Sequence, residues 1–441
     1  MLLKFYCSNY KSIKEEVSFS MFSGSYKRHS NHIVPFNNSG VLRTSAIYGA
    51  NGSGKTNLLL ALQFLRRLVV VENTRANQKI KIPVFKLSNC ENMPTKMELD
   101  FLHKNIRFRY LIEFKNNLII KEELYKINEE NENIIIFKRF KDDNNTRLTI
   151  FPNKKKTQKE RFREEIYAEE LNDNQSFFNI GFNKNIEDFD IPHDWFKKHL
   201  KFISLDDNLP GLASTFLLDK EFLKSSKNII KNAKVGIIDF KLVDYSFDEI
   251  KSLGVEFPNN IESNLLESDS LGIEFNHDGD LYSSYRDNGN LRFVKISTIH
   301  ENKKGEPIEF KFAEESKGVQ RLFELLPAIY RTIHKGEVFI IDEIETSFHP
   351  ILIKEILKLY LDSTPTNSGQ IIFTTHESHL LDLDLFRQDE IWFCEKTKDG
   401  SSKLYSLSEF KPRFDKDIRK GYFEGQFGFV PFLGNRKQLE L

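Results

Sequence analysis

The chain has few cysteines, no long apolar run and no excess of either charge. Cys7, Cys90 and Cys394 are scattered through 441 residues without a CxxC pair. This excludes a zinc site built from cysteines and predicts a reducing, cytoplasmic location. Nowhere do about 18 apolar residues follow one another, so we expect no membrane-spanning helix. The opening segment turns polar too early for a signal peptide.

Positive and negative side chains balance, with Lys+Arg and Asp+Glu at 64 each. The balance argues against a surface coated for constitutive binding to nucleic acid or membrane, but it allows a local patch. The basic side chains that make the strongest such patch are Lys138, Arg139, Lys141, Arg147, Lys154, Lys155, Lys156, Lys159, Arg161 and Arg163. They could contact DNA, RNA or an acidic protein. Because few aromatic side chains suited to base stacking accompany them, a solvated loop is favoured.

The segment from Gly49 to Thr56, GANGSGKT, matches GxxxxGK[ST] in full. It lies between a short apolar strand at 45–48 and a helical pattern that follows. Glycines let backbone N–H groups converge on phosphates, and the helix adds the positive end of its dipole. We predict that Lys55 reaches the β- and γ-phosphates and that Thr56 ligates Mg²⁺. The remaining residues of the predicted phosphate cradle are Asn51, Gly52, Ser53 and Gly54.

Hydrophobic patterning places this loop in an α/β fold. Residues 97–127 alternate apolar and polar side chains, with Asn116-Asn117 as a hairpin turn, which predicts an antiparallel β layer. The C-terminal third alternates buried strands with helices, as a parallel sheet does. We therefore predict a P-loop core with a mixed, largely parallel sheet. Its parts are 1–127 and 306–441, and residues 128–305 form a large α+β insertion.

A second apolar strand, at 338–341, ends in two carboxylates, Asp342 and Glu343. Asp342 stands where a Walker B aspartate holds Mg²⁺ through water. Glu343 stands where a base polarises the attacking water. An apolar strand that merely ends in polar residues is the alternative, and the P-loop makes the hydrolytic interpretation the stronger one.

Two further motifs resemble parts of ATP-binding-cassette (ABC) ATPases. A strand at 371–375 closes on His376, 33 residues after Glu343, where that class places a histidine that senses the γ-phosphate. The segment ESKGVQR, which begins at Glu315, is similar to the Ser-Gly-Gly-Gln signature, with lysine in place of the first glycine. The resemblance implies that Ser316 and Gly318 bind the γ-phosphate of an opposite subunit. A capping histidine and a plain helix N-cap are the alternatives.

In order and spacing, the motifs resemble the ABC ATPases of the SMC, RecF and Rad50 kind. Within that group the chain is similar to the ATPase subunits of bacterial anti-phage systems related to the OLD (overcoming lysogenization defect) ATPases, such as the AbiL/RloAB and PARIS types. The segments that carry the resemblance are SAIYGANGSGKTNLLLAL, FAEESKGVQRLFELLPAI, FIIDEIETSFHP, FTTHESHLLD, EIWFCEKTKDGSSKLYSLSEF and GYFEGQFGFVPFL. They lie within residues 1–127 and 306–435.

The resemblance implies a catalytic role for Glu343 and His376, with ATP and Mg²⁺ as cofactors. It also implies that two or more copies of the chain sandwich ATP head to tail. Glu345 to Pro350 would be the D-loop, with His349 where many relatives carry aspartate. Gln78 and Gln175 are both candidates for the Q-loop glutamine. The chain stops at Leu441, which leaves no room for the Toprim nuclease domain of OLD proteins, so a nuclease or toxin effector is expected in a separate protein.

Three functions compete at this point. The first is a defence ATPase that senses infection and controls a partner effector. The second is a DNA-repair or DNA-maintenance ATPase, which the absence of long heptads disfavours for the coiled-coil type. The third is an assembly scaffold that binds ATP with little turnover, against which the intact Glu343 argues.

Overall fold

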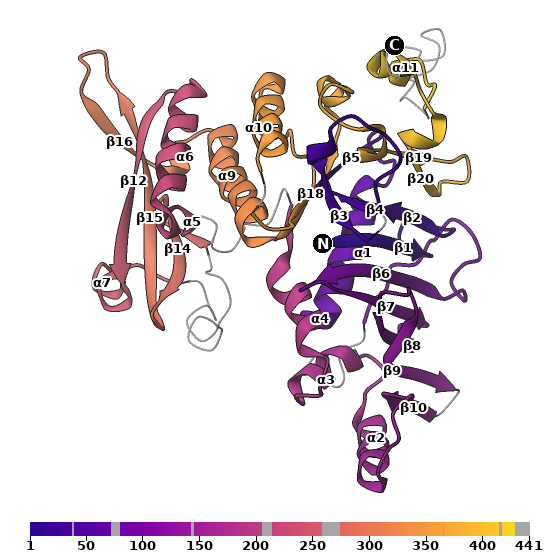
Figure 1. The fold of residues 1–441 in the computed structure, drawn as a ribbon. Helices are drawn as coiled ribbons and strands as arrows, with labels where there is room; N and C mark the ends of the chain where they lie inside the picture. Colours follow the sequence, from indigo (N-terminus) through magenta and orange to yellow (C-terminus); the bar gives the residue numbers. More distant parts are fainter. Residues whose placement is uncertain are drawn as a thin grey trace. The chain divides into compact units, whose positions relative to one another are not determined.

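The computed structural model describes residues 1–37, 39–71, 80–142, 145–204, 214–257, 274–364, 366–413 and 417–427. The chain forms two compact units, whose elements are labelled in Figure 1. Unit 1 comprises Met1–Lys201, Gly336–Asp342 and Ser368–Leu441, and unit 2 comprises Phe202–Lys335 and Glu343–Asn367. These two units are defined by the contacts between residues. The predicted division at residues 127 and 305 was based on sequence motifs instead, and it stays a prediction.

Unit 1 contains a seven-stranded antiparallel sheet of order β10-β9-β8-β7-β6-β1-β2. Its strands are β1 (Leu2–Ser8), β2 (Val17–Ser20), β6 (Thr95–His103), β7 (Ile106–Lys115), β8 (Leu118–Ile127), β9 (Asn133–Asp142) and β10 (Asn145–Ile150). Asn116 and Asn117 both have positive φ, 52° and 63°, and join β7 to β8. A two-residue turn of this kind matches the twist of the strands that it connects. The predicted antiparallel layer is therefore confirmed. The alternating pattern corresponds to β6, β7 and β8, and the sheet contains four further strands.

The second sheet of unit 1 is largely parallel. Strands β17 (Val338–Ile341), β18 (Gln370–Thr375), β5 (Thr44–Tyr48) and β19 (Ile391–Lys396) lie side by side in that order and run parallel, and β20 (Ser402–Ser406) closes the edge antiparallel. All residues of β5, β17 and β18 are buried, which explains their unbroken apolar composition. The predicted α/β fold with a mixed sheet is confirmed.

Short elements and helices complete unit 1. The strands are the β3–β4 hairpin (Ile33–Phe36, Ser39–Leu42) and β11 (Leu200–Ile203), within which the division between the units falls. The helices are α1 (Lys55–Val70), α2 (Gln158–Glu170), α3 (Phe177–Asn183), α4 (Asp190–Asp194), the π-helical turn η2 (Trp195–His199) and α11 (Ile418–Phe423). Trp195 stacks on Phe101 of β6 at 4.5 Å between ring centroids, and both are fully buried.

The basic run of residues 138–163 is not the solvated loop that its composition favoured. It covers the second half of β9, all of β10 and the first half of α2, and several of its charges are paired within unit 1. Arg139 is fully buried and donates to the carbonyls of Gln175 and Asn172. Its partner carboxylate, Glu122, accepts hydrogen bonds from the first N–H groups of α3. The polar composition favoured a solvated loop, but hydrogen bonds and ion pairs with other segments bury part of the run. A buried guanidinium such as that of Arg139 is stable only when it is hydrogen-bonded.

Unit 2 is built on an antiparallel sheet of order β12-β15-β14-β13, with β16 also paired to β15. The strands are β12 (Ile237–Ser246), β13 (Glu274–His277), β14 (Asp280–Asp287), β15 (Asn290–Glu301) and β16 (Pro307–Lys311). The helices are α5 (Thr215–Leu218), α6 (Lys220–Asn232), α7 (Phe247–Ser252), α9 (Lys317–Lys335) and α10 (Pro350–Asp362). Asp278-Gly279 and Asn288-Gly289 form the hairpin turns, as predicted. Among the described residues, no helix is long and apolar enough to cross a membrane.

Candidate functional site

Three motifs of unit 1 meet at one edge of the parallel sheet. In the register of the sheet, Phe373 of β18 pairs with Ile341 of β17 on one side and with Ala46 of β5 on the other. Because the three strands run parallel, their carboxyl ends share an edge. The segments that follow those ends are the Gly49–Thr56 loop after β5, Asp342 after β17 and His376 after β18.

The loop depends on glycine for steric and conformational reasons. A Cβ at Gly49 would lie 2.3 Å from the carbonyl oxygen of Cys394, a distance at which the backbone of β19 would have to move. Gly54 has φ +110° and immediately precedes α1, a conformation that residues with a Cβ rarely adopt. With these two glycines the loop curls tightly over the start of α1, whose first N–H groups are available to an anion.

Lys55 lies inside the curl of the loop and is 5% exposed. Its ammonium donates to the carbonyl oxygens of Gly49, at 2.8 Å, and Ala50, at 3.3 Å. It also lies 2.9 Å from Nε2 of His376. The other ring nitrogen, Nδ1, lies 3.4 Å from the same ammonium. The sequence-predicted loop lysine and switch histidine are thus in direct contact.

Oxygen atoms suited to a magnesium ion converge beside the loop. The Thr56 hydroxyl donates to Oδ1 of Asp342 at 3.3 Å, and the Thr374 hydroxyl of β18 donates to the same oxygen. Hydroxyl and carboxylate oxygens are the ligands that Mg²⁺ prefers. The two residues predicted to serve the metal therefore lie together with a donor set that fits it. Thr374 was not predicted, although its place at the end of a buried strand two residues before His376 was a signal.

A group of small polar side chains braces the loop, and none of them was predicted. The Ser402 hydroxyl of β20 donates to the carbonyl of Ser53 and lies 2.8 Å from Oγ of Ser12, which accepts from the side-chain amide of Asn57 at 2.7 Å. The thiol of Cys394 also donates to the Ser53 carbonyl, at 3.4 Å. Burial raises the pKa of this thiol to about 11, so it stays protonated. Ser12 lies in the turn that follows β1, outside every motif from which the site was predicted.

Within unit 2, the signature-like segment begins α9. The Ser316 hydroxyl accepts from the N–H of Val319 at 3.3 Å, which is the bonding of an N-cap residue. Gln320 fixes the approach to the helix, since its side-chain amide donates to the carbonyls of Phe312 and Glu315. A Cβ at Gly318 would lie 2.4 Å from the carbonyl oxygen of Ser347, so glycine is required there. Ser316 itself is exposed.

Glu343 opens a tight turn of unit 2 in a strained conformation. Its φ is +46°, and that of Ser347 is +69°, values that cost free energy in residues other than glycine. Thr346 holds the turn, because its N–H donates to the carbonyl of Glu343 and its hydroxyl donates to the Glu343 carboxylate at 3.2 Å. Strain that is fixed by surrounding bonds is common where a catalytic group must be aimed.

The remaining sequence candidates have other positions. His349 is the N-cap of α10, where its Nδ1 accepts from the N–H of Ile351 at 3.3 Å, a role that aspartate fills equally well. Gln175 lies in the turn before α3, with Oε1 accepting from the side-chain amide of Asn172. Gln78 and the end of the GYFEGQFGFVPFL segment, from residue 428 on, lie outside the described residues.

Comparison with known proteins identifies a family. A family model described as "AAA domain, putative AbiEii toxin, Type IV TA system" matches residues 45–382, more than half of the chain, from the strand before the P-loop to beyond His376. No curated protein sequence matches the chain.

Solved structures of SMC heads overlap the chain over most of its length. The SMC head domain from Thermotoga maritima is 13% identical over 92% of this chain and 98% of that one, with a TM-score of 0.36. The SMC head bound to the C-terminal winged-helix domain of ScpA is 14% identical over 93% of this chain and 99% of that one, with a TM-score of 0.42. A Pyrococcus furiosus SMC head with an extended coiled coil, bound to the C-terminal domain of ScpA, is 14% identical over 93% of this chain and 97% of that one. Its TM-score is 0.36. At these TM-scores the likeness adds nothing to the family match.

Proposed function

Because the chain belongs to this family of AAA domains, we propose that it hydrolyses ATP and thereby controls a separate effector in anti-phage defence. The family is an ABC-like group of ATPases related to those of abortive infection. The family match supports an ATPase of this class, and the geometry of the described site supports ATP hydrolysis. The role in defence and the separate effector rest on the likeness to ATPases of abortive infection.

One observation carries the hydrolytic part of the proposal. The hydroxyl of Thr56 and the carboxylate of Asp342 are 3.3 Å apart, although 285 residues separate them in the chain. The ammonium of Lys55 lies in the adjacent curl of the loop. A metal-binding oxygen pair next to an anion-binding loop is the arrangement that MgATP requires.

Each residue then has a distinct task. The loop N–H groups of residues 51–56 and Lys55 hold the phosphates. Thr56 and Asp342 would hold Mg²⁺, which would supply positive charge to offset that of the phosphates. Glu343, next in the chain after Asp342, accepts a proton from the attacking water. His376, whose ring contacts the ammonium of Lys55, senses the γ-phosphate that this ammonium binds.

We further propose that hydrolysis requires a second copy of the chain. Ser316 and Gly318 lie at the N-terminus of α9, where N–H groups can receive an anion, and the Ser316 side chain is exposed. In a head-to-tail pair these groups would complete the γ-phosphate site of the partner. A lone subunit would then bind ATP but turn it over slowly, because part of its transition-state stabilisation is missing.

A Ser316→Arg substitution tests the second copy. The large cation at an exposed N-cap should leave ATP binding by the monomer unchanged, while steady-state hydrolysis falls at least about tenfold through loss of one γ-phosphate donor. Binding is measured by titration with a fluorescent ATP analogue, and hydrolysis by phosphate release. Leu253→Arg, which places the same charge at an exposed position of unit 2, is the matched control. Full activity of the Ser316 variant would rule out the clamp between subunits.

Phage challenge tests the biological role. Bacteria that carry this gene with its neighbouring reading frames should form fewer plaques than bacteria that lack either the gene or its neighbour. The Lys55→Ala variant should lose the protection, because the signal depends on nucleotide. Protection that persists without any neighbouring frame would contradict a separate effector. ATP turnover that rises only on addition of DNA would favour the repair function instead.

A further inference from the structure

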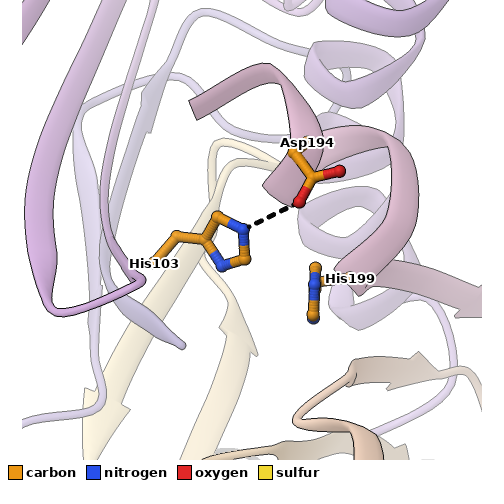
Figure 2. Close-up of side chains that lie close together, drawn as sticks. All are labelled: His103, Asp194 and His199. Atoms are coloured by element: carbon orange, nitrogen blue, oxygen red, sulfur yellow. Dashed lines mark hydrogen bonds and ion pairs between the residues drawn. The ribbon is translucent and has the colours of Figure 1, made fainter. Parts of the chain in front are cut away.

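In the part of the chain that the structure describes, one group of three side chains combines histidine and carboxylate in the manner of a metal site. His103, Asp194 and His199 each offer one ligand atom, and these atoms all lie within 4.8 Å of one another. Figure 2 shows the three side chains next to one another, with a hydrogen bond between His103 and Asp194. The group belongs to unit 1 and takes no part in the proposed nucleotide site.

We infer that His103, Asp194 and His199 bind a divalent transition-metal ion, with zinc as the ion that suits the donors. Zinc takes imidazole nitrogen and carboxylate oxygen at about 2.0–2.2 Å, and three protein ligands leave a fourth position for water. Two histidines with one carboxylate are a recurrent set for such ions. Mg²⁺ and Ca²⁺ prefer oxygen ligands alone, so they fit this group poorly.

Local backbone geometry brings two of the ligands to the same face. Asp194 and His199 are five residues apart, which in an α-helix of 3.6 residues per turn would place them about 140° apart. The segment between them is a π-helical turn instead, in which the N–H of Leu200 donates to the carbonyl of Trp195, five residues back. The wider turn swings His199 towards Asp194. Single π turns occur frequently at functional sites.

The surroundings hold the ligands in place. His103 ends β6, two residues after Phe101, whose ring stacks on Trp195 of the π turn, so strand and turn are packed together. The rings of His103 and His199 lie 4.5 Å apart between centroids. Nδ1 of His199 lies 3.3 Å from the carbonyl oxygen of Gly336. A neutral ring that donates there keeps the lone pair of Nε2 for a metal, which is how ligand histidines are commonly oriented.

One pair of ligand atoms already has the spacing of a bound ion. Nε2 of His103 and Oδ2 of Asp194 are 3.1 Å apart, close to the ~3.3 Å between two ligands of a tetrahedral zinc ion. Lys104 and Lys198 also pair with Asp194, but both are largely exposed and can turn to solvent. The ion would then tie the end of β6 to the segment that leads into β11, where the chain passes from unit 1 to unit 2.

Metal titration of the full chain tests the inference without reference to ATP turnover. Protein purified without a metal-affinity tag and treated with a chelator is titrated with Zn²⁺, and separately with Co²⁺, in the absence of nucleotide. We expect one equivalent of zinc per chain, a visible cobalt spectrum, and a melting temperature about 5 °C higher at a hundredfold excess over Kd. Absence of zinc binding, or no change in melting temperature, would overturn the inference.

Two variants and one control locate the site. His103→Gln and His199→Gln should each weaken zinc binding at least about tenfold, while ATP binding shows that the chain still folds. His277→Gln, which removes a histidine that lies 3.7 Å from a single carboxylate, that of Asp278, should bind zinc like the wild type. Should both variants fail to fold, X-ray absorption on the zinc-loaded wild type decides, because this site requires two imidazole ligands. A spectrum with fewer, or unchanged binding by folded variants, would disprove it.

Discussion

Lys55→Ala should weaken ATP binding at least about 100-fold, because a buried ammonium bonded to phosphate contributes roughly 3 kcal/mol. The Lys55 side chain is 5% exposed, and its ammonium is held by two carbonyl oxygens of the loop. Its loss removes the positive charge and leaves those carbonyl oxygens facing the phosphates. Calorimetric titration with MgATP measures the effect.

Lys396→Ala is the matched control for this experiment. The Lys396 ammonium contacts the same loop, at 3.3 Å from the carbonyl of Gly52, but its side chain is exposed at the end of β19. An exposed charge contributes little, so affinity should change by less than about threefold. Tight binding retained by the Lys55 variant would refute the assignment of the loop.

Glu343→Gln should reduce turnover at least about 100-fold and leave ATP binding intact, since a carboxamide cannot accept the proton of the attacking water. The two side chains have the same shape, and the glutamine oxygen can still accept from the Thr346 hydroxyl that holds the turn. The strained φ of +46° is therefore kept. Phosphate release under saturating MgATP and filter binding of labelled ATP separate the two effects.

Glu355→Gln makes the same chemical change at an exposed position of α10 and should keep turnover within about threefold. Turnover of the Glu343 variant at the wild-type rate would move the proposal towards an assembly scaffold, in which ATP is bound to hold subunits together and is rarely cleaved.

The parts of the fold that could be predicted from sequence are those in which local chemistry decides the outcome. A loop with GSGKT between an apolar strand and a helix has few other conformations, and Asn116-Asn117 matches a tight hairpin by its own backbone preference. The carboxylate after β17 could be predicted because parallel strands expose their carboxyl ends at one edge.

Other features depend on contacts between distant parts of the chain. Ser12 and Ser402 meet under the loop across 390 residues, and neither lies in a pattern that sets it apart. The charges of the basic run appeared solvated because Glu122, the partner of Arg139, comes from a neighbouring strand. The grouping of His103 with Asp194 and His199 depends on a π turn. That turn has only five residues, too few for a hydrophobic periodicity to reveal it in the sequence.

The order of strands in the parallel sheet has a consequence for synthesis on the ribosome. The strand β5 carries the nucleotide loop, yet both of its neighbours, β18 and β19, come more than 320 residues later in the chain. At about 5–20 residues per second, translation reaches them only some 16–65 s after β5. Until then the edges of β5 are unpaired and the loop has neither Asp342 nor His376 beside it. The nascent chain therefore exposes the unpaired edges of an apolar strand, a template for association with other chains, until the last sixth of the protein emerges.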